Sequence, residues 1–232
     1  MIRRHPANQR GHFDFGWLDT HHTFSFGDFH DPARMGFRAL RVINEDRVQP
    51  GQGFGMHGHR DMEIISLILA GGLEHRDSLG NGSVITSGML QRMTAGTGVR
   101  HSEFNPSATA PTHLYQIWLL PRTRSLPPGY EQREFDPTGS DGRLQLVAAP
   151  VPTAGALTVH QDAALFLARL SAGQEVRHEL RPGRHAWLQV LAGAAALNGQ
   201  PLEAGDGAAV SEEALLKIQA ADAAQLLLFD LA

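Results

Sequence analysis

The sequence predicts an all-β protein, folded as a sandwich or a barrel, on three observations. Short segments of aliphatic and β-branched residues recur along the chain. Turn-forming stretches such as SLGNGS, LNGQPL and EAGDG separate many of them. Long helical periodicity is weak, and many short apolar segments with regular interruptions are typical of β-sandwiches and β-barrels.

The expected strands follow in order along the chain. They are 63–69 (EIISLIL), 113–120 (HLYQIWLL), 144–150 (LQLVAAP), 186–193 (AWLQVLAG) and 225–232 (QLLLFDLA). Residues 163–170 (AALFLARL) fit a helix or a strand, and Gly173 follows closely. Short apolar segments bounded by glycine, proline and asparagine favour strands over helices.

A faint internal repeat indicates two β units. In each half an apolar strand ends in an Ala-Gly pair, an Asn-Gly turn follows, and a further glycine comes next. The matching positions, 117 to 122 residues apart, are Gly71 and Gly193, Asn81-Gly82 and Asn198-Gly199, and Gly88 and Gly205. A duplicated unit explains this spacing, and chance glycine matches are the alternative. We expect domains at 1–125 and 156–232, joined by a proline- and glycine-rich connection at 126–155.

Composition narrows the classes of function. The 232 residues carry a formal charge of −4, which provides no general basic field for nucleic acid. The absence of cysteine excludes disulfides, thiolate metal sites and cysteine nucleophiles. The longest apolar run, around 64–73, is too short to span a membrane, and no apolar signal-peptide stretch follows the basic start MIRRHPANQR. We therefore expect a cytoplasmic protein without membrane or direct nucleic-acid partners.

Four residues form a candidate metal site. His57 and His59 are two residues apart, as are His101 and Glu103, so each pair points to one face of an extended strand. Three imidazoles and one carboxylate suit a divalent first-row metal and leave positions open for water, substrate or dioxygen. In a chain with 13 histidines about one His-x-His arises by chance, so ordinary exposed histidines remain an alternative on spacing alone.

The surroundings of these residues resemble known motifs. The stretch GQGFGMHGHRDME (51–63) resembles the first cupin motif, and GVRHSEFN (98–105) resembles the end of the second. The closing glycine of the first motif comes one residue late, at Gly71, and Gly96-Thr97-Gly98 stands where the second has Pro-x-Gly. Both departures resemble the pirin branch of the cupins. The same likeness extends over residues 22–48, 57–81, 90–103, 113–120, 130–135 and 159–166 and the closing LLLFDL.

The pirin resemblance implies a fold and a ligand set. The fold would be a bicupin of two tandem, jelly-roll-like β-barrels, with metal bound only in the N-terminal one. The ligands would be His57, His59, His101 and Glu103, whereas ordinary cupins use the first-motif glutamate, here Glu63. The implied cofactor is one divalent ion, with Fe(II) expected and Zn, Cu, Ni, Co or Mn as alternatives.

The second half is expected to lack metal ligands. His178 and His185 flank the turn-like RPGR and read as surface or packing histidines. When the two halves are aligned through their glycines, the residues that match the four ligands are Glu179, Arg181, Ile218 and Ala220. We therefore interpret the C-terminal barrel as a packing partner or cover for the first.

Other residues rank lower as functional candidates. His21 and His22 read as structural or pocket-edge residues. On strand 113–120, alternation allows either Gln116 and Trp118 or the opposite face to line a cavity, but not both. An aromatic-rich segment reads as packing over a barrel rather than as a cofactor site; its members are Phe13, Phe15, Trp17, Phe24, Phe26 and Phe29.

The resemblance implies quercetin 2,3-dioxygenase activity, with O₂ and a small, flavonol-like aromatic substrate. In this hypothesis the metal binds the 3-hydroxyl and 4-carbonyl oxygens, Glu103 takes the hydroxyl proton, and ring opening releases carbon monoxide. The main alternative is a regulatory protein that senses metal and redox state and acts through a protein partner. A third interpretation is a bicupin whose metal is only structural.

Overall fold

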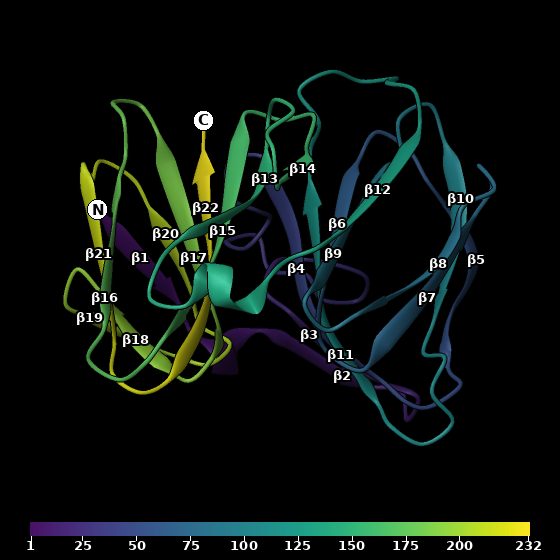
Figure 1. Cartoon of the computed structure of the whole chain (residues 1–232), viewed down its shortest axis with the longest axis horizontal. Coiled ribbons are helices and arrows are strands. Elements are labelled where there is room, and N and C mark those ends of the chain that lie inside the picture. Colours follow the sequence, from purple (N-terminus) through teal and green to yellow (C-terminus); the bar gives the residue numbers. More distant parts are fainter. The chain divides into compact units, whose positions relative to one another are not determined.

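The computed structural model consists almost wholly of antiparallel strands (Figure 1), which confirms the all-β prediction. It describes the backbone of residues 1–232 and every side chain except that of Pro137. The strands form two compact units. We call residues 11–135 with 157–161 the histidine barrel, and residues 1–10, 136–156 and 162–232 the apolar barrel.

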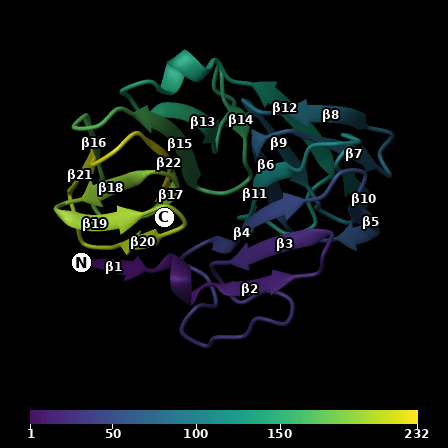
Figure 2. The ribbon, with the colours of Figure 1, turned by 90° about the horizontal axis from the view of Figure 1, so that it is seen from below.

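The histidine barrel consists of a large and a small sheet. Its strands are β2 (Gly11–Asp14), β3 (Leu18–His22), β4 (Leu40–Val48), β5 (Gly53–His59), β6 (Glu63–Ala70), β7 (Gly72–Asp77), β8 (Gly82–Thr86), β9 (Met89–Thr94), β10 (Val99–Phe104), β11 (Thr112–Leu119), β12 (Gly129–Glu134) and the short β14 (Leu157–Thr158). The large sheet has the order β12-β9-β6-β11-β4-β3-β2, and the small sheet has the order β5-β10-β7-β8. Figure 2 shows β2, β3 and β4 side by side.

The apolar barrel repeats this plan. Its elements are β1 (Ile2–His5), the 3-10 helices η1 (Ala7–Gln9) and η2 (Pro137–Ser140), β13 (Gln145–Ala149), β15 (Ala163–Leu170), β16 (Glu175–Glu179), β17 (His185–Ala192), β18 (Ala194–Leu197), β19 (Gln200–Glu203), β20 (Gly207–Val210), β21 (Leu215–Ala220) and β22 (Ala224–Leu231). Its strands in one sheet have the order β1-β20-β17-β22-β15-β13, and those in the other have the order β16-β21-β18-β19.

Corresponding strands occupy the same places in the two barrels. The series β9-β6-β11-β4 matches β20-β17-β22-β15, and β5-β10-β7-β8 matches β16-β21-β18-β19. Gly71 and Gly193 occupy the same turn in both, with φ of +77° and +72°, in the left-handed region that favours glycine. At each turn a Cβ would press against the backbone of the strand opposite. The shared order and shared turn are those of a duplicated unit.

The strands predicted at 63–69, 113–120, 144–150, 186–193 and 225–232 are β6, β11, β13, β17 and β22, and the ambiguous 163–170 is a strand, β15. The compact units differ from the predicted ranges 1–125, 126–155 and 156–232. β12 falls in the predicted connection but pairs with β9 of the histidine barrel. β1 lies at the start of the chain but pairs with β20 of the apolar barrel. Pairing between strands that are distant in sequence, rather than position along the chain, decides to which compact unit a strand belongs.

The two interiors differ in character. The apolar barrel has one continuous aliphatic core, which includes Leu188 and Leu228. In the histidine barrel the apolar residues form smaller clusters, such as those around Leu73 and Ile64, and buried polar side chains occupy much of the inner face. Among the described residues, no helix has the length and apolar character needed to cross a membrane.

Candidate metal centre

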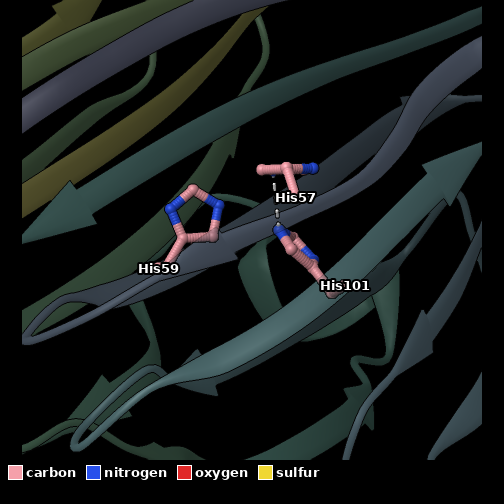
Figure 3. Close-up of side chains that lie close together, drawn as sticks. All are labelled: His57, His59 and His101. Atoms are coloured by element: carbon pink, nitrogen blue, oxygen red, sulfur yellow. Dashed lines mark hydrogen bonds between the residues drawn. The ribbon is translucent and has the colours of Figure 1, made fainter.

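Three histidines converge between β5 and β10 (Figure 3). His57 and His59 stand two residues apart on β5, and His101 pairs directly with His57 across the ladder. The Nε2 atoms of His57 and His101 are 3.1 Å apart. The three ring centroids lie 4.5, 4.7 and 4.9 Å from one another. The structure thus brings together the three histidines that the sequence predicts as ligands.

The geometry of these histidines fits a bound metal ion. Two imidazole nitrogens that bind one ion at about 2.1 Å are separated by about 3.0–3.4 Å in octahedral or tetrahedral coordination, and the observed 3.1 Å falls in this range. Nδ1 of His57 lies 2.8 Å from the carbonyl oxygen of Gly55. A hydrogen bond there places the ring proton on Nδ1 and leaves the Nε2 lone pair free for a metal.

Burial keeps two of the histidines neutral. It lowers the pKa of His59 to about 4, and the neighbouring His57 adds to the effect. Burial, followed by proximity to His57 and His59, lowers the pKa of His101 to about 3. At neutral pH both rings therefore carry lone pairs rather than extra protons, and neutral imidazole is the form that binds divalent metals.

Glu103 is buried beside His101, and both of its carboxylate oxygens accept hydrogen bonds. Gln91 Nε2 donates to Oε1 at 2.7 Å, and Gln116 Nε2 donates to Oε2 at 2.8 Å. Ser66 Oγ makes a longer contact of 3.4 Å to Oε1. Burial raises the pKa of Glu103 to about 7, although these hydrogen bonds act in the opposite direction. Glu103 can therefore exchange a proton near neutral pH.

Two further contacts fix which end of each glutamine faces Glu103. The Tyr130 hydroxyl donates to Oε1 of Gln91 at 2.9 Å, and Trp118 Nε1 donates to Oε1 of Gln116 at 3.1 Å. Because each amide oxygen accepts from an aromatic donor, each amide NH₂ group turns towards the carboxylate. The two donors limit the movement of Glu103.

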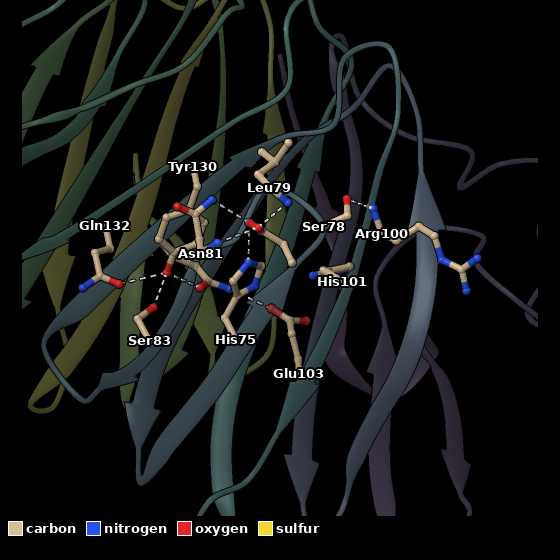
Figure 4. Close-up of polar contacts among 12 residues, drawn as sticks. His75, Ser78, Leu79, Asn81, Ser83, Arg100, His101, Glu103, Tyr130 and Gln132 are labelled. Atoms are coloured by element: carbon tan, nitrogen blue, oxygen red, sulfur yellow. Dashed lines mark hydrogen bonds and ion pairs between the residues drawn. The ribbon is translucent and has the colours of Figure 1, made fainter.

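Ligand atoms of His75, His101 and Glu103 lie within 4.8 Å of one another, forming a second group that shares His101 with the first (Figure 4). Glu103 as the fourth ligand of the three histidines remains a prediction. Sequence reasoning missed His75, which is fully buried on β7 with its Nε2 3.1 Å from Asp77 Oδ2. Its alternation with the less buried Glu74 and Arg76 was the available signal.

Glu63, the alternative carboxylate, makes different contacts. It is fully buried, and its Oε2 lies 3.1 Å from the backbone nitrogen and 3.2 Å from Nδ1 of His160. The ring of His160 is also 3.2 Å from the Thr94 hydroxyl. These contacts tie the segment 157–161 to the histidine barrel, which is a structural role.

A pocket of about 500 Å³ adjoins the histidines. His57, His59 and Glu103 line it, together with Gln116 and Trp118 of β11. Alternation left open which face of this strand meets the cavity, and the structure selects the Gln116 face. The pocket thus combines two candidate metal ligands, a proton-exchanging carboxyl group and an aromatic wall.

The aromatic segment near the N-terminus contributes more to this pocket than expected. Packing over the barrel was the prediction, and Phe24 does pack with no exposed surface. Four other members of the segment line the pocket together with Phe54; they are Phe13, Phe15, Trp17 and Phe26. The pocket wall needs their large apolar faces, which composition alone cannot distinguish from packing surface.

The pair His21-His22 is divided between two environments. His22 lines the pocket, as a pocket-edge residue. His21 forms a further group of titratable side chains with His12 and Asp19 on β2 and β3. The rings of His12 and His21 stack 4.2 Å apart with their planes only 11° apart. Both rings approach the same carboxylate oxygen, because His12 Nε2 lies 2.9 Å and His21 Nδ1 lies 3.6 Å from Asp19 Oδ1.

Among its described residues, the apolar barrel holds no equivalent ligand set. His75 pairs with Glu103, and at the matching place Leu197 pairs with Ile218. From this register the counterparts of His57, His59, His101 and Glu103 are His178, Leu180, Leu216 and Ile218. His178 alone is a potential ligand, and its Nε2 lies 2.8 Å from Asp230 Oδ2. His185 contacts the Ser211 hydroxyl at 2.8 Å.

This register corrects the alignment made through the glycines. That alignment placed Glu179 opposite His57 and Ile218 opposite His101. Thirteen residues separate Gly205 from Ile218, whereas fifteen separate Gly88 from Glu103. The connection after the matching glycine is therefore two residues shorter in the apolar barrel, and strand pairing rather than turn position sets the correspondence.

Comparison with known proteins agrees with these features. The pirin family model matches residues 3–119, and a model described as the quercetinase C-terminal cupin domain matches residues 146–231. A relative from Escherichia coli strain K12, named quercetin 2,3-dioxygenase, is 47% identical over 231 residues, covering 100% of this chain and 99% of the relative. A pirin-like protein from Caulobacter vibrioides is 37% identical over 233 residues, covering 100% of both.

A solved structure is similarly close. The bacterial pirin YhhW from Escherichia coli, in complex with nickel(II), is 46% identical and superposes with a TM-score of 0.95, covering 100% of this chain and 99% of that one. The similarity thus extends over both barrels and includes a relative that binds metal. On its family match, its full-length relatives and its paired barrels, this chain belongs to the pirin family and is a bicupin.

Proposed function

We propose that this chain is a metal-dependent dioxygenase that cleaves a flavonol such as quercetin with O₂ and releases carbon monoxide. The observation that carries the proposal is Glu103, a buried carboxyl group with a pKa of about 7 in a pocket also lined by His57 and His59. The full-length relative named quercetin 2,3-dioxygenase supports the reaction class. The nickel complex of a bacterial pirin supports a metal at this site.

His57, His59 and His101 are the proposed metal ligands, with Glu103 as the fourth. Fe(II) is the ion we expect, and nickel(II) in the related pirin indicates that such sites accept other first-row ions. When bound, the ion would lower the pKa of a coordinated hydroxyl group and hold substrate close to O₂. The Gly55 carbonyl orients the ring of His57 for this role.

The protein's own residues would perform the proton transfer and the positioning. Glu103 leaves the ion partly or wholly and accepts the 3-hydroxyl proton of the flavonol, since the pKa of its ion-free carboxyl group, about 7, suits proton transfer at neutral pH. Gln91 and Gln116 hold the carboxylate in place through their amide groups. The aromatic walls of the pocket bind the planar rings and exclude water.

The test measures oxygen uptake and released carbon monoxide with Fe(II)-reconstituted protein and quercetin. We expect one carbon monoxide per O₂ for the wild type, and no turnover for His101→Ala. Glu103→Gln, confirmed to hold metal, should turn over about 10²–10⁴-fold more slowly. His178→Ala, in the barrel without a ligand set, is the matched control and should retain full activity. Metal-loaded wild type that consumes no O₂ would contradict the proposal.

The regulatory alternative receives no support from the comparisons. It predicts partner binding that depends on the redox state of the metal, in the absence of turnover. We propose instead that the binding partners are small molecules, namely a flavonol-like substrate and O₂. Cytoplasmic location remains a prediction.

A further inference from the structure

Strand β4 presents two polar side chains to the pocket. Asn44 and Asp46 both line it, and each is only 3% exposed. Residues two apart on a strand share a face and lie roughly 7 Å from each other. These two positions therefore form a polar region of the pocket on β4, in addition to the histidines of β5 and to Glu103, whose pKa is raised by burial and further by the neighbouring Asp46.

Both side chains contain a buried oxygen without a partner. Asn44 Oδ1 and Asp46 Oδ1 have no hydrogen bond to any group that the structure describes. Asp46 does receive one hydrogen bond, from the Thr20 side chain. An unpaired buried acceptor lowers stability, so such atoms in a pocket wall favour a ligand that donates hydrogen bonds to them.

The surroundings select a neutral donor over a cation. Burial is the main cause that raises the pKa of Asp46 to about 7, so at neutral pH about half of these carboxyl groups carry no charge with which to bind a cation. A cationic ligand would also pay to leave water for a wall that contains Phe13, Trp17 and Phe54. A hydroxyl group on an aromatic ring donates a hydrogen bond without bringing a charge, and its ring packs on the aromatic side chains.

We propose that Asn44 and Asp46 form a hydroxyl-binding subsite that receives two hydroxyl groups of an aromatic ring of the substrate. This inference rests on the proposed function and deepens it, because it selects flavonols that carry hydroxyl groups on a ring remote from the 3-hydroxyl. Asn44 and Asp46 are specificity-determining residues here, and the reacting atoms stay at the histidines and Glu103.

The test compares binding of two flavonols to anaerobic, metal-loaded protein. One is quercetin, and the other lacks both hydroxyl groups on the ring attached at position 2. Wild type should bind quercetin about tenfold to a hundredfold more tightly, on the basis of about tenfold for each hydrogen bond. Asn44→Leu and Asp46→Leu, which remove one acceptor each and keep a similarly branched side chain, should each reduce this preference about tenfold. An unchanged preference in both variants overturns the inference.

Controls separate folding and reaction from recognition. Asn44→Asp retains an acceptor and should retain the preference, and His178→Ala should leave it unchanged. Melting temperature and metal content show that each variant is folded, and Asp46→Ala, which also removes the acceptor, replaces the leucine variant if that one does not fold. If neither flavonol binds, the proposed function fails, and titration with 1,2-dihydroxybenzene, which carries the adjacent hydroxyl pair of that quercetin ring, then decides the inference. Saturable binding that Asn44→Leu weakens about tenfold supports the subsite, and no binding overturns it.

Discussion

The two barrels share a strand order but differ along one row of their inner faces. The row crosses neighbouring strands at paired positions. In the histidine barrel it consists of Gln91, Ser66, Gln116, Asn44 and His22. At the same places the apolar barrel has Ala208, Leu188, Leu228, Phe166 and Leu146. This row, together with the ligand positions of the small sheet, distinguishes a barrel with candidate chemistry from a barrel with an apolar core.

The comparison shows that a polar row replaces apolar packing with side chains that need hydrogen-bond partners. Leucine and alanine in the row join a continuous apolar core, which stabilises the barrel without directional contacts. Glutamine, serine and asparagine must find hydrogen-bond partners once they are buried, and Gln91, Ser66 and Gln116 find one in Glu103. Asn44 keeps an unpaired oxygen at the pocket. The fold accepts either row, so the side chains rather than the topology determine the function.

The largest expected difference between the barrels concerns metal. His101→Ala removes one of three converging imidazoles and should lower the bound divalent ion from one per chain to almost none. His178→Ala, at the position that corresponds to His57, should leave the metal content unchanged. Elemental analysis of dialysed protein measures both. Full metal occupancy in His101→Ala would show that the ion binds elsewhere.

The next effect concerns stability along the contrasting row. Leu188→Ala opens a cavity in the apolar core and should lower the free energy of unfolding by about 2–5 kcal/mol. At the paired place in the histidine barrel, Ser66→Ala loses the long hydrogen bond to Glu103 and the one that Ser66 Oγ accepts from Gln91, and it should cost about 1–2 kcal/mol. Urea denaturation of both variants gives the comparison. Equal losses would mean that the polar row contributes as much packing as the apolar one.

A buried carboxyl group in the histidine barrel should give a distinctive pH dependence. Burial raises the pKa of Asp46 from 3.8 to about 7, so its contribution to stability is complete below pH 4 and is lost as the pH rises to 7. This loss is on the order of 4 kcal/mol. Asp46→Asn cannot ionise and should be more stable than wild type at pH 8, with a smaller advantage towards pH 4. Thermal unfolding across this pH range measures the difference in stability. A difference that stays constant with pH would contradict the assignment.

The smallest expected effect concerns Asp230 in the apolar barrel, a carboxyl group whose pKa is lowered rather than raised. Burial would raise the pKa of Asp230, but hydrogen bonds from His178 and Arg184 outweigh it and lower the pKa. Its stabilisation is therefore present above about pH 4, the range of an unfolded aspartate, and is lost as acid protonates it. Asp230→Asn should lower the free energy of unfolding by about 1–2 kcal/mol at pH 7. This loss of stability relative to wild type should become smaller below pH 4. A loss that becomes larger there would contradict a lowered pKa for Asp230.

Strand alternation and motif spacing predicted the fold class and brought His57, His59 and His101 to one place. They could not identify Gln91, and they left open whether Gln116 faces the cavity, because β9 and β11 flank β6 only in the folded sheet. Their importance depends on register between strands that are not consecutive. The same reason explains the misplaced alignment of Ile218 and the domain ranges that the sheet pairing redrew.

The aromatic segment shows a second limit of sequence reasoning. Phe15 and Trp17 have the composition of packing residues, and their role in the pocket follows from where β2 and β3 join the large sheet. Hydrophobicity indicates burial against something apolar, and it does not distinguish a core from a ligand pocket. A rule based on composition therefore assigns such residues to packing.

The pairing of β1 with β20 has a consequence for the order of events during synthesis. A ribosome extrudes the chain from its N-terminus, so β1 emerges about 200 residues before the strand with which it pairs. β2 to β12 lie together within residues 11–135 and can pair while translation continues. Until β20 leaves the exit tunnel, β1 cannot form this pairing, and its backbone groups form hydrogen bonds with water. The barrel that carries the histidines is thus free to assemble first, and the opening residues of the chain are among the last to find their place.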